Sequence, residues 1–179
     1  MDIKEIEKRR HGILEAFTKE LNDSLIAAVL NNDEGAPESV SAILDELGGG
    51  EMEVLGEFFF RQPETEDDGA QVFTCVFTIA DDIPAERLPA LYEAISYVNF
   101  SIPAGCFSID KDHRFFCYVL STFMPADLED SEVFREIDLA AGNAMAIADT
   151  YIGILSDVLE GTIDADGVVE FLGGPAEEK

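Results

Sequence analysis

Residues 114–123 predict a β-strand that is apolar on both of its faces, and this restricts the folds open to the 179-residue chain. An antiparallel strand with one solvated side alternates apolar with polar residues. Here one side would carry Phe116, Tyr118 and Leu120, and the other Phe115, Cys117, Val119 and Phe123. We therefore expect both sides to be covered, the second one either by the N-terminal helices or by another subunit.

Alternating side chains predict two further strands, at 51–61 and 70–80, before the hairpin at 105–123. In the first of these strands Phe58 and Phe60 fall on one side, and Glu57 and Arg61 on the other. An acidic loop is expected at 63–69, between the two strands.

The three cysteines all lie in strand-like stretches. We expect Cys75, Cys106 and Cys117 to be buried, reduced thiols, because a disulfide scaffold has more cysteines, in even number. If Ile109 pairs with Arg114, then Phe107 faces Phe116 and Cys106 faces Cys117, which leaves a redox link between those two cysteines as an alternative.

Apolar residues at steps of three and four predict helices at 2–30, 37–47, 84–99 and 131–160. The chain is expected to be a single domain over 1–161, followed by a C-terminal tail at 162–179. Helices that alternate with strands in this way predict an α+β fold, a twisted antiparallel sheet packed with helices.

The charge is strongly acidic, with 11 Lys and Arg against 38 Asp and Glu, a net charge of −27. Nucleic acids and anionic membranes bind through basic residues, so neither is an expected partner. No apolar run is long enough to span a membrane, and the charged start does not resemble a signal peptide, which predicts a cytoplasmic protein. The acidity itself indicates either a need for solubility or the attraction of a basic partner.

No constellation of residues predicts catalysis. The acidic segments at 110–113 and 164–167 are typical of turns, and the second lacks the glutamate of a calcium loop. Neither His11 nor His113 lies beside a nucleophile, and no phosphate-binding glycine loop occurs. We expect no catalytic residue, no cofactor and no metal site; the alternative is an enzyme that uses a divalent cation held by carboxylates.

A family resemblance rests on the middle of the chain. Residues 91–99 read Leu-Tyr-Glu-Ala-Ile-Ser-Tyr-Val-Asn and precede Gly-Cys-Phe-Ser-Ile-Asp at 105–110. The strand at 115–120 and a long helix with Tyr151 and Gly161 follow. Over about 50–160 this pattern resembles the YbjN family, labelled bacterial sensory transduction regulators, which has the type III secretion chaperone-like fold.

The resemblance implies an α-β-β(-β)-α-β-β-α order, a homodimer, and no catalytic residue or cofactor. Secretion chaperones of this fold bind extended segments of other proteins along apolar grooves. We therefore expect a non-enzymatic protein-binding module, chaperone-like or regulatory, that binds a second copy of itself and, as a further partner, another protein or a peptide segment. The residues expected at the interface are Leu88, Tyr92, Phe115, Val119 and Phe123.

Overall fold

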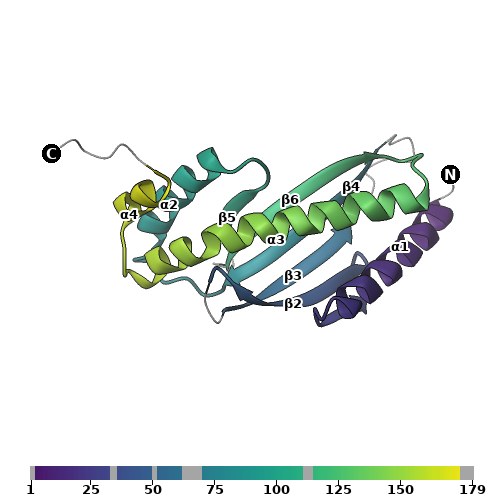
Figure 1. The fold of residues 1–179 in the computed structure, drawn as a ribbon, viewed down its shortest axis with the longest axis horizontal. Coiled ribbons are helices and arrows are strands. Elements are labelled where there is room, and N and C mark those ends of the chain that lie inside the picture. Colours follow the sequence, from purple (N-terminus) through teal and green to yellow (C-terminus); the bar gives the residue numbers. More distant parts are fainter. Residues whose placement is uncertain (1–2, 33–35, 50–51, 62–69, 111–114, 174–179) are drawn as a thin grey trace. The chain divides into compact units, whose positions relative to one another are not determined.

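The computed structural model describes residues 3–32, 36–49, 52–61, 70–110 and 115–173 (Figure 1). Its helices are α1 (Ile3–Asp23), α2 (Leu88–Ser101), α3 (Asp130–Glu160) and α4 (Ala165–Phe171). Its strands are β1 (Ala28–Asn31), β2 (Ser39–Leu47), β3 (Met52–Phe60), β4 (Ala70–Ala80), β5 (Cys106–Asp110) and β6 (Phe115–Pro125). The loop predicted at 63–69 and most of the turn predicted at 110–113 lie outside the described residues.

The strands form one open antiparallel sheet in the order β1-β2-β3-β4-β6-β5, and with the helices they confirm the predicted α+β fold. The chain forms two compact units, each assembled from three segments of the sequence. The first unit comprises Met1–Leu44, Leu55–Val76 and Leu120–Ala144. The second unit comprises Asp45–Val54, Phe77–Val119 and Met145–Lys179.

The prediction of a helix over 37–47 is wrong, because this segment forms β2. Val40, Ala42 and Leu44 are each at most 3% exposed, and a spacing of two places them on one side of the sheet. A short apolar run fits both a helical and an alternating spacing. Here the hydrogen bonds that β1 and β3 offer on either side of β2 favour the strand.

The N-terminal helix is shorter than the predicted 2–30, since α1 ends at Asp23. Leu25 has a φ of 66°, and the amide of Ile26 donates to the carbonyl of Leu21 at 2.9 Å. This is the usual way in which a helix stops with a left-handed residue, although glycine commonly takes that position. The following residues form β1, in which Ala28 pairs with Ala42 of β2.

In the first unit, α1 and the first part of α3 lie on the same side of the sheet, which we call the inner side (Figure 1). Phe17 of α1 is fully buried there. Its ring meets those of Phe58 on β3 and Phe73 on β4 edge-on, at centroid distances of 5.3 and 6.2 Å. The N-terminal helix therefore covers the inner side, as α3 does. The opposite side of the sheet, which we call the outer side, is covered by no helix among the described residues of this unit.

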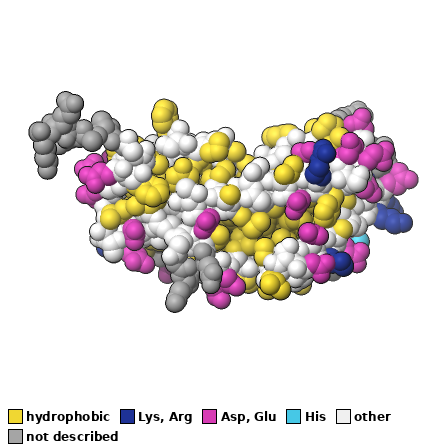
Figure 2. Space-filling model, in the orientation of Figure 1, with side chains coloured by type: hydrophobic (Ala, Val, Ile, Leu, Met, Phe, Trp, Pro, Cys, Tyr) yellow, Lys and Arg dark blue, Asp and Glu magenta, His cyan; other side chains and the backbone are white. Residues whose placement is uncertain are grey.

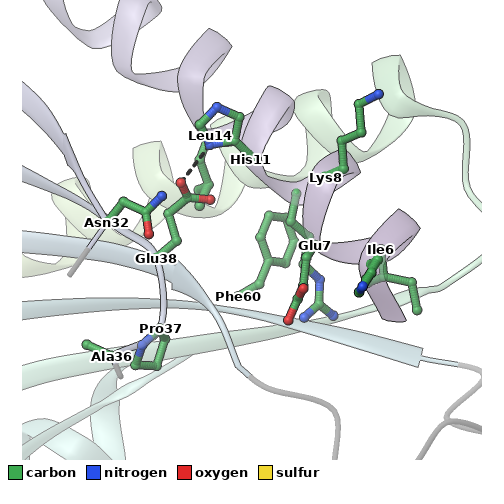
Figure 3. Close-up of a pocket in the computed structure, with 12 residues that line it drawn as sticks. Ile6, Glu7, Lys8, His11, Leu14, Asn32, Ala36, Pro37, Glu38 and Phe60 are labelled. Carbon is green, nitrogen blue, oxygen red and sulfur yellow. Dashed lines mark hydrogen bonds and ion pairs between the residues drawn. The ribbon is translucent and has the colours of Figure 1, made fainter. Parts of the chain in front are cut away.

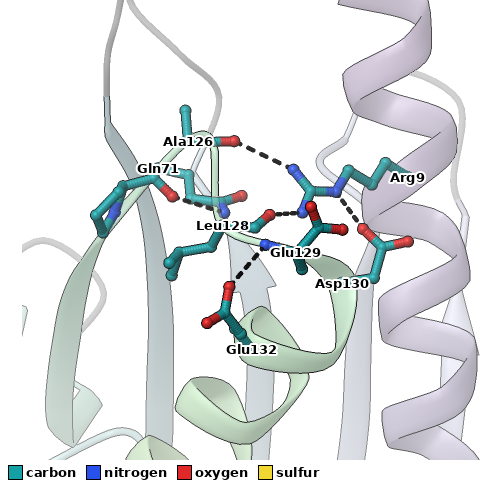
Figure 4. Close-up of polar contacts among 8 residues, drawn as sticks. Arg9, Gln71, Ala126, Leu128, Glu129, Asp130 and Glu132 are labelled. Carbon is teal, nitrogen blue, oxygen red and sulfur yellow. Dashed lines mark hydrogen bonds and ion pairs between the residues drawn. The ribbon is translucent and has the colours of Figure 1, made fainter.

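One arginine joins α1 to the start of α3 (Figure 4). The guanidinium of Arg9 donates to the carbonyls of Ala126, at 3.1 Å, and Leu128, and pairs with the carboxylate of Asp130. Only 16% of the Arg9 side chain is exposed. This one side chain thus satisfies two backbone carbonyls in the turn between β6 and α3.

Replacing Arg9 by alanine is expected to lower the free energy of unfolding by about 1.5–3 kcal/mol, the usual worth of hydrogen bonds made by a charged donor. Urea unfolding followed by circular dichroism measures the change. Lys19→Ala is the matched control, since Lys19 pairs with Asp23 at the surface, where both side chains are more than half exposed. We expect no measurable change in that variant, and an equal loss in both variants would contradict the role of Arg9.

In the second unit, the core gathers aromatic rings from β4, β5 and β6. The ring of Tyr118 lies 4.9 Å from that of Phe107 and 6.1 Å from that of Phe77. Helix α2 packs against β5 and α4, and begins at Leu88, so that Pro89 stands in its first turn. Helix α4 occupies part of the segment predicted to be a tail.

The predicted register of the hairpin is wrong by two residues. Ile109 pairs with Phe116, and Phe107 with Tyr118. A shift of two keeps every side chain on its predicted face, so the sides of β6 are as predicted. Cys106 consequently faces Val119, and Cys117 faces Ser108. Cys106 is also exposed rather than buried, because it begins an edge strand.

Candidate functional site: the outer surface of the sheet

The outer side of the first unit carries apolar side chains that reach solvent. Phe123 is 75% exposed, and Leu55 and Ile43 are each 40% exposed. The same side of the strands, by their alternation, also carries half-buried Phe59. We call this side the outer surface, and it includes Ile43, Leu55, Glu57, Phe59, Arg61, Val72, Thr74, Val76, Ser121 and Phe123.

Three polar side chains form a hydrogen-bonded cluster within this surface. Arg61 Nε donates to Thr74 Oγ1 at 3.1 Å, and its Nη2 lies 3.5 Å from Ser121 Oγ. The hydroxyls of Thr74 and Ser121 lie 3.0 Å apart. The cluster joins the residue that follows β3 to β4 and β6, and it engages only some of the five donors of the guanidinium.

Charge is distributed unevenly over the molecule. On the side drawn in Figure 2, acidic side chains are scattered over the surface, and most lysine and arginine side chains gather near α1. By contrast, the outer surface holds one acid, Glu57, and one base, Arg61. It is therefore both more apolar and closer to neutral than the chain as a whole, which carries −27.

An asparagine covers part of each edge of the sheet. At the β1 edge, Asn22 donates to the carbonyl of Ala28 at 3.0 Å and accepts from its amide at 3.2 Å. At the β5 edge, Asn99 bonds the carbonyl and the amide of Phe107 in the same way, at 2.9 and 2.8 Å. A side-chain amide that mimics a neighbouring strand blocks the addition of another strand there.

The five residues predicted for the interface lie in both units. Phe123 belongs to the outer surface of the first unit and is its most exposed aromatic side chain. In the second unit, Phe115 and Val119 lie half-buried on the corresponding side of β6. Leu88 and Tyr92 lie on α2, outside its buried set, and Tyr92 is 37% exposed.

A pocket of about 630 Å³ opens beside the first half of α1 (Figure 3). His11 Nδ1 lies 2.6 Å from a carboxylate oxygen of Glu38, and this hydrogen bond raises the pKa of His11. The guanidinium of Arg10 stands 5.1 Å from the centre of the Phe60 ring, and burial lowers its pKa. In Figure 3 Lys8 points away from Phe60 and Glu7.

Two of the three thiols are not activated. Burial raises the pKa of Cys75 to about 12 and that of Cys117 to about 11, so both are protonated at neutral pH. Within the described part of the chain, no three metal-ligating side chains lie together. No helix of that part has the length and apolarity needed to cross a membrane.

Sequence patterns did not show the polar cluster or the asparagines at the edges. Thr74 and Ser121 are 47 residues apart along the chain, and their contact depends on the pairing of β4 with β6. For Asn99 a signal existed, because it belongs to the quoted pattern in which an asparagine precedes a glycine and a phenylalanine. Its partner, Phe107, is the phenylalanine of that pattern.

Comparisons with known proteins give structural neighbours only. YbjN from E. coli, a proposed transcription regulator, aligns over 75% of this chain and 87% of its own, with a TM-score of 0.39 and 11% identity. An uncharacterized protein from Methanothermobacter thermautotrophicus aligns over 81% of this chain and 97% of its own, with a TM-score of 0.42 and 14% identity. No family model and no curated protein matches the sequence, so membership of the YbjN family stays a prediction.

Proposed function

We propose that this chain is a non-enzymatic protein-binding module that binds through its outer surface, and that a second copy of the chain is its partner. The observation that carries the proposal is the exposed apolar character of that surface, with Phe123 at 75% exposure. Contiguous apolar surface rimmed by charge is typical of interaction sites. Phe115 and Val119 on β6, and Leu88 and Tyr92 on α2, belong to the second unit and are proposed as an interface of that unit in its own right.

The edges of the sheet favour binding over the outer surface rather than by the addition of a strand at an edge. Partners that add a strand need free amides and carbonyls at an edge. Asn22 and Asn99 already occupy these groups at Ala28 and Phe107. A partner therefore gains more by covering apolar side chains on the outer surface than by pairing with β1 or β5.

The acidity of the chain is compatible with self-association at physiological salt. At an ionic strength of 0.15 M the Debye length is about 8 Å, so charges remote from the interface are largely screened. The surfaces brought together carry one acid and one base each. We expect the dimer to dissociate at low salt, where the net charge of −27 on each copy acts over a longer range.

Light scattering coupled to gel filtration tests the proposal in 0.15 M NaCl. The wild type is expected at twice the 19.6 kDa of one chain. Phe123→Asp is expected to weaken the dimer at least 30-fold, as at an interface hot spot where truncation costs about 2 kcal/mol or more. Phe100→Asp is the matched control, because Phe100 is 94% exposed on α2 and is not on the outer surface. A monomeric wild type would exclude self-association.

A further inference from the structure

The outer surface carries one acid and one base on the same strand, and neither is ion-paired within the part of the chain that the structure describes. Glu57 and Arg61 are four residues apart on the outer side of β3 and its continuation, which separates them by about 13 Å.

The position of Arg61 is fixed by the fold. Its amide donates to the carbonyl of Val72 at 2.9 Å, and its own carbonyl accepts from Arg10 Nη1 at 3.1 Å. Thr74 and Ser121 hold the guanidinium as described above, and engage only part of its donor set. A guanidinium preorganised in this way loses little rotamer freedom when it binds a carboxylate.

The charges of Glu57 and Arg61 favour one kind of partner for the outer surface over others. An acidic segment would pair with Arg61 but would bring like charge to Glu57, and a basic segment would do the reverse. A second copy offers both charges at the same spacing. In a two-fold interface, if residue i contacts residue j, then j also contacts i, so each copy satisfies the charges of the other.

We infer that two copies pack their outer surfaces face to face around a two-fold axis near Phe59, with Arg61 of each copy paired to Glu57 of the other. Phe59 lies midway between the two charged residues on β3. The axis lies between the two sheets and crosses β3 at a right angle, so that the β3 strands of the two copies run antiparallel. Glu57 of one copy then lies opposite Arg61 of the other. Sheets pack about 10 Å apart, a gap that an arginine and a glutamate span together. This inference rests on the proposed function and names the residues that set the register of the dimer.

Charge exchange tests the pairing. Glu57→Arg and Arg61→Glu are each expected to weaken the homodimer at least tenfold, because like charges then meet across the axis. A one-to-one mixture of the two variants is expected to recover the dimer as a heterodimer, which native mass spectrometry distinguishes by mass. The double variant Glu57→Arg/Arg61→Glu is expected to recover the homodimer. Asp138→Arg, at an exposed position of α3 in the same unit, makes the same change in net charge as Glu57→Arg and is expected to leave the dimer intact.

The outcomes separate this inference from the proposed function. If Phe123→Asp dissociates the dimer while the charge variants do not, or if their mixture fails to recover it, the pairing is overturned and the binding surface stands. A monomeric wild type overturns both, and would leave an unrelated protein as the occupant of the surface. If Arg61→Glu does not fold, as judged by circular dichroism, Arg61→Gln replaces it; the mixture with Glu57→Arg should then recover the dimer in part, and no recovery would overturn the pairing.

Discussion

Replacing Phe17 by alanine is expected to lower the free energy of unfolding by about 3–5 kcal/mol, the range found for truncation of a buried phenylalanine. Phe17 is 0% exposed and stands at the centre of the first unit. Its ring contacts Phe58 and Phe73 edge-on, so the substitution removes two aromatic pairs as well as buried area. The neighbouring rings are held by β3 and β4 and cannot collapse into the space.

The measurement is equilibrium unfolding in urea, followed by circular dichroism. Since domains of this size are typically stable by about 5–15 kcal/mol, the expected loss is a large part of the total. Phe100→Ala is the control, because it removes the same ring at a position that is 94% exposed. A loss below about 1 kcal/mol for Phe17→Ala would show that α1 does not pack on the sheet as described.

The position of Phe17 was predictable because α1 is long. Its apolar residues repeat over five turns, and Ile13, Phe17 and Leu21, which follow one another at steps of four, are all at most 5% exposed. The same repetition predicts α3, where Ile137, Ala144 and Ile152 are fully buried. A helical spacing that recurs over 20–30 residues can be recognised even where single residues depart from it, whereas in a short segment one such residue changes the prediction.

The strands β1 and β2 were not predicted, and the reasons are local. Leu25 takes the left-handed conformation that usually marks a helix end with glycine, so α1 has no visible stop there. Val40 and Leu44 in β2 are four residues apart, a spacing that one face of a helix shares with one side of a strand. Only the pairing of β2 with its neighbours decides between the two, and pairing is a long-range property.

The candidate site was predictable in part. The apolar outer side of β6 follows from alternation alone, which predicts that Phe115, Val119 and Phe123 share one side of the strand. Glu57 and Arg61 were correctly predicted to share a side of their strand. That this side joins the outer side of β6 depends on the strand order, in which β4 links β3 to β6. The anchoring of Arg61 by hydroxyls of β4 and β6 depends on the same order.

The residues behind the family resemblance have structural roles in this chain. Asn99 bonds the backbone of Phe107 at the β5 edge, and Phe107 packs on Tyr118 in the core. The hydroxyl of Tyr118 donates to the carbonyl of Ala104 at 2.9 Å, next to Gly105. The pattern therefore describes how α2 is joined to the hairpin.

Gly105→Ala is accordingly expected to destabilise the protein by about 3 kcal/mol, from two causes. Gly105 has a φ of +70°, a conformation that costs a residue with a Cβ about 1–2 kcal/mol. In addition, a Cβ there would lie 2.3 Å from the Tyr118 hydroxyl and 2.7 Å from the carbonyl oxygen of Val119. Tyr118 is fully buried and the carbonyl belongs to β6, so neither can move without disturbing the core, at a typical cost of about 1–3 kcal/mol.

Gly49→Ala separates the two causes, because Gly49 has nearly the same φ, +71°, and a Cβ at this position would have no atom within 4 Å. Urea unfolding is expected to show a loss of about 1 kcal/mol for this variant, the strain alone. The difference between the two variants then measures the close approach of Gly105 to Tyr118. If the two losses are equal, the hairpin is not packed against its preceding turn as described, and the structural explanation of the Asn-Gly-Phe pattern fails with it.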